Sequence, residues 1–143
     1  MGSIGSFGQG MGDQDIAAAW AKGSLWFKVP SSVKLVFKGK RPANISAKDI
    51  TLNLLKIFGT NTLLENSIEF YDETIEELTL DERITIASMA TEMGAIIFLF
   101  PPNKAIHDFC EEKTGRKLEL FKADENAKYE DVKEIDISSF VPM

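Results

Sequence analysis

Cysteine and histidine are almost absent from this sequence. Its 143 residues include one cysteine, Cys110, and one histidine, His107. A single cysteine excludes an internal disulfide and is typical of a reducing compartment, so we expect a cytoplasmic protein. The two residues cannot supply the repeated ligand spacing of a zinc site. They lie three positions apart on a predicted helix, where a Cys–His pair can touch. An ordinary helix with a half-buried cysteine is the simpler interpretation.

A basic excess and a long apolar run are also missing. The formal net charge is −6, which argues against nucleic acid as a partner. No apolar run approaches the roughly 20 residues that span a membrane, and the N-terminus lacks a signal-peptide pattern. We therefore expect neither nucleic acid nor a membrane as a partner. The chain is 44% hydrophobic, enough for one domain that buries roughly 68–70% of its unfolded surface.

Glycine, by contrast, is concentrated near the N-terminus, just before a predicted alanine-rich helix. Gly8 and Gly10 match the first two glycines of a dinucleotide-binding fingerprint. Asp13 occupies the third position, however, and no strand precedes the loop. With Asp15 it would place carboxylates where an anionic ligand binds. We interpret Asp13 as the helix cap and Asp15 as a complement to the helix dipole, and we reject a phosphate loop.

Strand and helix patterns alternate along the rest of the chain. The predicted strands are residues 25–30, 33–38, 67–71, 95–100, 117–122 and 132–138, and three further helices are predicted over residues 47–58, 80–93 and 104–113. The helix boundary signals are capping boxes at Ser46–Asp49 and Thr79–Glu82, an asparagine cap at Asn103, and glycines at positions 59, 94 and 115. This order predicts a layered α/β domain, a sheet with helices and some parallel pairing. We expect Trp20 and Trp26 to lie in its core.

The predicted helix that ends at Met93 has two unlike faces. At 100° per residue, one arc is apolar and should face the core; it contains Ile86, Met89, Ala90 and Met93. The opposite face is small and almost uncharged, with Ile84, Ala87, Ser88 and Thr91 on it and Glu92 at its flank. We expect this face to be covered or to line a cleft; a sparsely charged surface helix is the alternative.

Several segments of the chain match one known family in the same order. They are residues 5–18, the Leu-Trp-Phe-Lys-Val-Pro run at 25–30, and residues 46–49, 68–71, 84–86, 89–90, 92–95, 127–129 and 134–138. Together they resemble the aconitase superfamily, closest to the large subunits of 3-isopropylmalate dehydratase. The resemblance covers nearly the whole chain, and the joint order of the motifs makes it specific.

This resemblance implies a fold and an activity. Residues 24–143 should form an α/β domain like the second domain of aconitase-type hydro-lyases, and residues 1–23 should belong to the preceding domain. The family removes and re-adds water on a hydroxy acid at a 4Fe-4S cluster. The resemblance favours 3-isopropylmalate, a step of leucine biosynthesis. Homoaconitase, aconitase or another malate-derivative dehydratase is the alternative, and so is a non-catalytic interaction domain that retains the fold.

The family motifs that hold the cluster, a C-T-N-G segment and a later C-x-x-C, do not occur here, nor does its D-S-H-T segment. We therefore expect an internal piece of a larger enzyme, inactive and without a cluster by itself. A gene fragment, a split subunit and an excised domain would look alike. The implied partners are the cluster-binding domain of the large subunit, a small subunit that forms a swivelling domain, and a small hydroxy acid.

Two positions correspond to active-site residues of the family. Its N-x-x-x-E helix motif places a glutamate at Glu92, where a carboxylate can accept a proton or hydrogen-bond bound hydroxide. The asparagine of that motif is replaced by Ser88, a shorter side chain with one hydroxyl. Ala87 stands where relatives commonly have cysteine. These departures suggest a divergent member of the family.

Overall fold

A single sheet of four parallel strands organises the chain. The computed structural model describes residues 2–143, apart from the side chain of Glu73. The sheet has the order β3-β2-β1-β4, and every neighbouring pair is parallel. Its strands are β1 (Ser32–Lys38), β2 (Ser67–Tyr71), β3 (Ile97–Leu99) and β4 (Asp131–Asp136). The predicted α/β class is therefore confirmed.

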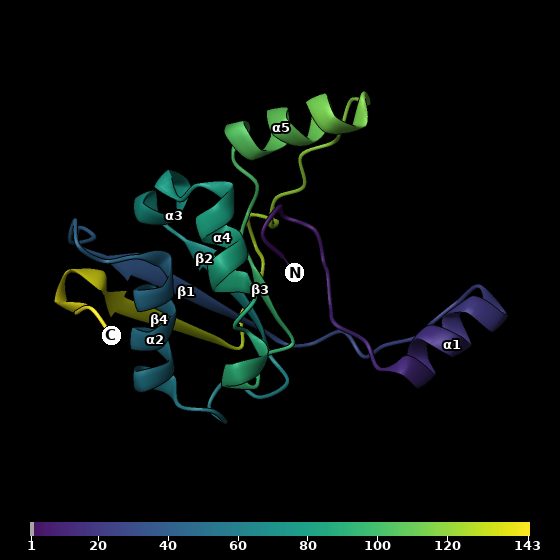
Figure 1. Cartoon of the computed structure of the whole chain (residues 1–143), viewed down its shortest axis with the longest axis horizontal. Coiled ribbons are helices and arrows are strands. Elements are labelled where there is room, and N and C mark those ends of the chain that lie inside the picture. The colour runs from purple at the N-terminus through teal and green to yellow at the C-terminus, as the bar shows by residue number, and fades with distance from the viewer. Residues whose placement is uncertain (1) are drawn as a thin grey trace.

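Helices cover one face of this sheet. The helices of residues 2–143 are α1 (Asp13–Lys22), α2 (Ala47–Phe58), α3 (Glu73–Glu77), α4 (Leu80–Ala87), α5 (Lys104–Thr114) and two 3-10 turns, η1 (Thr91–Met93) and η2 (Ile137–Ser139). Figure 1 shows α2 and α4 side by side in front of the strands, where they pack against each other. Helix α5 stands further out, and α1 lies well away from the sheet.

The core lies between the strands and this helix layer. Alternate residues of β1, Val33, Leu35 and Phe37, are buried and face it. Phe70 of β2 is at its centre and packs edge-on to the ring of Phe37, with 5.9 Å between the ring centroids. The same ring stacks on another phenylalanine that directly follows β3. Aromatic contacts thus join three of the four strand segments.

The helix boundary signals are confirmed, with one exception. Both capping boxes form, and the Asn103 side chain accepts a hydrogen bond from the Ile106 backbone. Asp13 is not a cap: the N-cap of α1 is Gly12, and the Asp13 carboxylate accepts from the next residue, Gln14. The helix starts one residue earlier than predicted, so Asp13 lies inside the first turn with Asp15.

Some predicted strands are wrong or shorter. Residues 25–30 and 117–122 have no strand partner and no regular structure. The first run lies on the segment that carries α1, outside the sheet, so nothing pairs with its backbone. The predicted strand at 95–100 is reduced to Ile97–Leu99, and the last one ends at Asp136, where η2 begins. Val132 is 55% exposed because it pairs with Lys34 and lies on the opposite face of the sheet from the buried Ile135.

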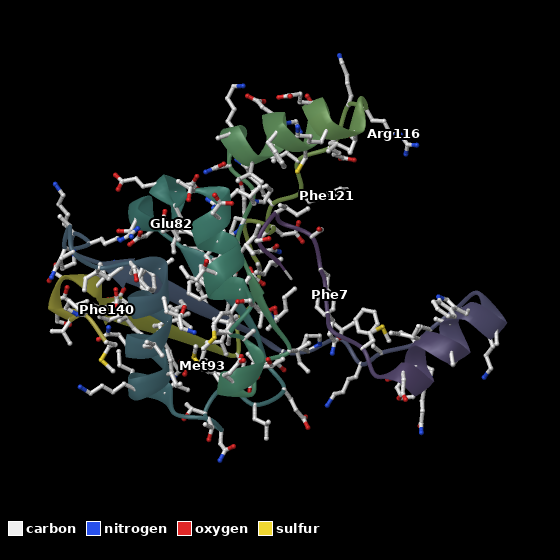
Figure 2. The ribbon with its side chains drawn as sticks, viewed as in Figure 1. Phe7, Glu82, Met93, Arg116, Phe121 and Phe140 are labelled. Carbon is white, nitrogen blue, oxygen red and sulfur yellow. The ribbon has the colours of Figure 1, made fainter. Side chains whose placement is uncertain are left out.

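The prediction for the two tryptophans is also wrong. Trp20 is 85% and Trp26 87% exposed, and α1 has no buried residue. Figure 2 shows the side chains of this part of the chain pointing into open space. Residues 2–5, in contrast, contact the sheet: the Gly2 carbonyl accepts a hydrogen bond from the Phe100 N–H at 2.9 Å. Across residues 2–143 no helix combines the length and apolar character needed to cross a bilayer.

Candidate active site

The segment that carries the two predicted site residues is not one continuous helix. α4 ends at Ala87, and a turn leads into the 3-10 turn η1. The backbone N–H groups of Met89 and Ala90 bond to carbonyls three residues back, the tighter 3-10 pattern. The Ala95 N–H then returns to the carbonyl of Ala90. The predicted helix over residues 80–93 is therefore too long, although Gly94 does end the segment in a left-handed conformation.

The buried face of this segment is shifted from the predicted arc. Arg83, Ile86, Ala87 and Ala90 are fully buried, which is the i, i+3, i+4, i+7 pattern of a core-facing helix. Ala87, expected on the outer face, is therefore in the core. Met89, expected in the core, is only half-buried. The predicted arc began at Ile84 and left out Arg83, whose burial shows where the core face lies.

Ser88 and Glu92 both lie on the exposed side of this segment. The Ser88 hydroxyl donates to the Thr85 carbonyl at 2.8 Å, so the side chain turns back onto its own helix. The Glu92 carboxylate accepts from the Thr91 hydroxyl at 3.1 Å. Lys48, from the first turn of α2, approaches the same surface and donates to the Met89 sulfur at 3.3 Å. The surface thus presents one carboxylate, one ammonium and small hydroxyls.

Gly94 fixes where this surface sits relative to the sheet. Its φ is +78°, and a Cβ atom there would lie 2.8 Å from the Thr60 carbonyl oxygen. The Gly94 carbonyl also accepts from the Glu65 N–H, in the loop that leads into β2. η1 is therefore held at the amino ends of the strands. Open parallel sheets generally bind ligands at the opposite, carboxyl edge, so Glu92 would have to work with surfaces beyond this sheet.

The carboxyl edge has a cluster that the sequence did not reveal. The Arg83 guanidinium is completely buried and donates to the carbonyls of Ile75, Leu78 and Pro101. Burial lowers the pKa of this group, and the nearby Glu76 carboxylate opposes that shift. The helical spacing of Arg83 with Ile86 and Ala90 was the only sequence signal of its burial. Its role is to tie the helices after β2 to the turn after β3.

A second polar cluster lies on the sheet face away from α2 and α4. The hydroxyls of Tyr71 and Tyr129 both reach one oxygen of Glu69, at 2.8 and 3.1 Å. The Lys34 ammonium lies 4.6 Å from the centroid of the Tyr71 ring. Burial, followed by the hydrogen bonds to Tyr129 and Glu69, raises the pKa of Tyr71. The cluster anchors the loop before β4 to the sheet.

His107 has a structural contact that fits the simpler interpretation of the Cys–His pair. Its Nε2 atom lies 2.9 Å from the Leu118 carbonyl oxygen, and the Leu118 N–H donates to Glu111 at 2.9 Å. These two side chains of α5 hold residues 117–122 alongside the helix, in place of strand pairing. Cys110 is half-buried and carries a free thiol.

These features define an α/β domain with one exposed carboxylate, that of Glu92, near the amino ends of a parallel sheet. The match to known proteins is specific: the model of the aconitase family (aconitate hydratase) matches residues 1–143, and the chain belongs to that family. It is 40% identical over 141 residues to a 3-isopropylmalate dehydratase large subunit of Clostridium kluyveri, covering 99% of this chain and 34% of the relative.

Other relatives carry the same description. A large subunit of Caldicellulosiruptor saccharolyticus is 39% identical over 99% of this chain and 33% of its own length. The 3-isopropylmalate dehydratase large subunit 1 of Pyrococcus abyssi is 36% identical over 99% of this chain and 34% of its own. The chain spans about a third of the length of the curated relatives it matches.

The family implies a 4Fe-4S cluster, and the side chains of this chain do not fit one. Such clusters are held mainly by cysteine thiolates, and the sequence has only Cys110. In the described part of the chain no three His, Cys, Asp or Glu side chains converge as a metal site would require. The chemistry that this chain supplies is therefore that of its own side chains.

Proposed function

We propose that this chain is part of an aconitase-type hydro-lyase that acts on a small hydroxy acid, with 3-isopropylmalate of leucine biosynthesis as the leading substrate. The position of Glu92 is the main support. Its side chain is exposed, on a segment whose end is fixed by Gly94. Dehydratase large subunits match 99% of the chain that carries it. In the complete enzyme, working in the cytoplasm, the 4Fe-4S cluster would be held by polypeptide outside this chain.

Glu92 is the proposed acid–base residue. Dehydration breaks a C–O and a neighbouring C–H bond, forms C=C and releases water. A carboxyl group at position 92 can give its proton to the departing hydroxyl, while a separate base of the complete enzyme accepts the proton of the C–H bond; in the hydration direction the Glu92 carboxylate takes a proton back from water. The exposed position and the single hydrogen bond from Thr91 leave the other carboxylate oxygen open to a substrate.

Ser88 is proposed to line the same site beside Glu92. Because its hydroxyl proton is donated to Thr85, it would offer only oxygen lone pairs to a ligand, whereas an asparagine amide also donates. We therefore expect the contact with the substrate at this position to differ from the contact that an asparagine would make. The remaining partners that we propose are the cluster-binding part of the large subunit and the small subunit.

The test uses a complete enzyme. This chain replaces the matching third of the Clostridium kluyveri large subunit, and the chimera is combined with the small subunit and assayed for dehydration of 3-isopropylmalate. Glu92→Gln should lower kcat by roughly 10²–10⁴-fold with the cluster absorption intact. Glu112→Gln, at an exposed glutamate of α5, is the matched control and should leave kcat unchanged. An active Glu92→Gln chimera would refute the assignment, and an inactive parent chimera would favour a non-catalytic domain.

A further inference from the structure

Lys48 brings a positive charge to the surface that carries Glu92. The capping box of Ser46 and Asp49 fixes the start of α2, so Lys48 lies in the first turn of this helix, with an exposed side chain. α2 packs beside α4 (Figure 1) and also contacts η1. From this position the Lys48 ammonium donates to the Met89 sulfur at 3.3 Å. The first turn of α2 therefore reaches across to the segment of the candidate site.

Met89 and Glu92 lie on the same side of their segment. They are three residues apart, and the backbone hydrogen bonds around them follow the 3-10 pattern, in which side chains at positions i and i+3 eclipse. The burial of both Ala90 and Met93, which are also three residues apart, has the same period. Because the Lys48 ammonium contacts Met89, it lies on the Glu92 side of this segment.

The charge of Lys48 has no carboxylate partner among the described side chains. Lys38, Lys104 and Lys133, by contrast, each form an ion pair with a carboxylate. The acceptor at Lys48 is a thioether sulfur, which accepts hydrogen bonds only weakly. An ammonium has three donors, so donors of Lys48 remain available to an anionic ligand.

The adjacent carboxylate, that of Asp49, is engaged elsewhere. One of its oxygens accepts from both the backbone N–H and the hydroxyl of Ser46. The other oxygen accepts from the Met143 N–H at 2.8 Å. Asp49 thus serves the cap of α2 and holds residue 143, and its carboxylate is not directed at Lys48.

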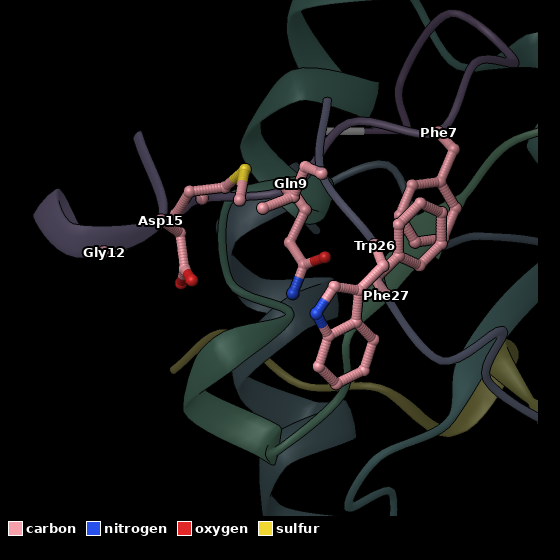
Figure 3. A pocket seen from close by; sticks show the side chains of 9 residues that line it. Phe7, Gln9, Gly12, Asp15, Trp26 and Phe27 are labelled. Atoms are coloured by element: carbon pink, nitrogen blue, oxygen red, sulfur yellow. The ribbon is translucent and has the colours of Figure 1, made fainter. Parts of the chain in front are cut away.

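The cavity at the glycine loop is less suited to an anion than the surface beside Lys48. Its volume is about 300 Å³, and Figure 3 shows Gln9, Asp15, Phe7 and Trp26 around it. None of the described residues that line this cavity is basic, and its charged side chain is the Asp15 carboxylate. A carboxylate ligand would be repelled there, whereas the ammonium of Lys48 would attract it.

We propose that Lys48 binds a carboxylate of the hydroxy-acid substrate beside Glu92. The inference rests on the proposed function in one respect, that a hydroxy acid binds at this surface. Such a substrate is an anion at neutral pH, and it approaches a chain of net charge −6. An ammonium offsets this repulsion and donates charge-assisted hydrogen bonds to the carboxylate. Lys48 is then the substrate-binding residue and Glu92 the acid–base residue of one site.

The first test is kinetic and uses the chimera described above. Lys48→Met should raise KM for 3-isopropylmalate at least about tenfold, because it removes a charged hydrogen-bond donor. kcat should change by less than about threefold, the pattern of lost substrate binding. Lys48→Arg keeps the charge and should restore most of the affinity, which a purely structural contact with Met89 would not require. Lys56→Met, at an exposed lysine in the last turn of α2, is the matched control and should leave KM unchanged.

A second measurement needs no turnover and uses the chain itself. Isopropylsuccinate, which is the substrate without its hydroxyl group, cannot be dehydrated. At millimolar concentrations it should shift the methyl NMR signal of Met89 in a saturable way, since this side chain contacts Lys48. The shift should be absent in Lys48→Met, absent with the neutral diamide of isopropylsuccinate, and present in Lys56→Met.

Either of two results would overturn the inference. One is a KM of the Lys48→Met chimera within about twofold of its parent. The other is a Met89 signal that isopropylsuccinate leaves in place, or shifts equally in Lys48→Met. An inactive chimera with a Lys48-dependent shift in the chain would refute the hydro-lyase assignment alone. An active chimera whose KM does not respond to Lys48→Met would refute the role of Lys48 alone.

Discussion

The guanidinium of Arg83 donates a hydrogen bond of 2.8 Å to the carbonyl of Pro101, and thereby joins α4 to the turn that follows β3. A cation without exposed surface is costly unless its donors are satisfied. Here backbone carbonyls, not a carboxylate, satisfy them. The contact is structural, and it lies on the same helix that leads to Ser88 and Glu92.

Arg83→Met should therefore destabilise the chain, because three carbonyl oxygens lose a charged donor. We expect a loss of about 3 kcal/mol in the free energy of unfolding, measured by urea titration. Lys56→Met, at an exposed position of α2, is the control and should change it by less than about 0.5 kcal/mol. Equal effects of the two substitutions would contradict this role of Arg83.

Gly94→Ala should cost more than Gly115→Ala. Both glycines have a left-handed φ, so both substitutions carry a backbone strain of about 1–3 kcal/mol. Only at Gly94 would the new methyl group meet a backbone atom, the Thr60 oxygen at 2.8 Å, whereas nothing lies within 4 Å at Gly115. The difference in unfolding free energy between the two variants measures the cost of the contact with Thr60, which holds η1 in place. No difference would mean that η1 is not fixed there.

Met93→Ala should cost about 2–5 kcal/mol, as expected of a fully buried side chain. Met89→Ala should cost less, because Met89 is only half-buried. Thermal or urea unfolding of the two variants distinguishes the observed shortened helix from a continuous one, in which Met89 would be a core residue. Equally large losses in the two variants would indicate that the helix continues to Met93, because both side chains would then face the core.

Stability should decline at acidic pH in part through Glu82. Burial by itself would raise the pKa of this carboxyl group, but hydrogen bonds from Arg41 and Thr79 outweigh burial and lower it. A lowered folded pKa contributes stability above the unfolded value of about 4.3, and that contribution is lost as the pH falls through the folded pKa. Glu82→Gln should flatten this part of the stability–pH curve, measured by urea unfolding, and Glu112→Gln should not.

Local signals in the sequence predicted much of the fold. The capping boxes at Ser46 and Thr79, and the glycine stop at Gly94, depend on neighbouring residues only, and all three form. The burial of Arg83 and the exposure of Trp20 depend on distant parts of the chain. A sequence pattern registers residue type, so it assigned the indole of Trp20 to the core and did not include Arg83 there.

The candidate site was likewise predicted only in part from the sequence. The motif resemblance singled out Glu92 and Ser88, and both side chains lie on one exposed face. The approach of Lys48 to Met89 could not be predicted, because it depends on how α2 packs on α4. The cluster of Tyr71, Tyr129 and Glu69 escaped prediction because it joins β2 to a loop that is distant in the sequence.

The strand order has a consequence for how the chain folds. β1 pairs on one side with the next strand, β2, but on the other side with the last strand, β4, where Val33 meets Asp131. Nearly the whole chain must be synthesised before that second partner exists. Pairing β1 with β4 closes a long loop, and the entropy lost in that step makes it slow. Until β4 is in place, β1 should expose an unpaired edge during translation and early folding. That interval, more than the native state, is when this chain should be most prone to aggregate.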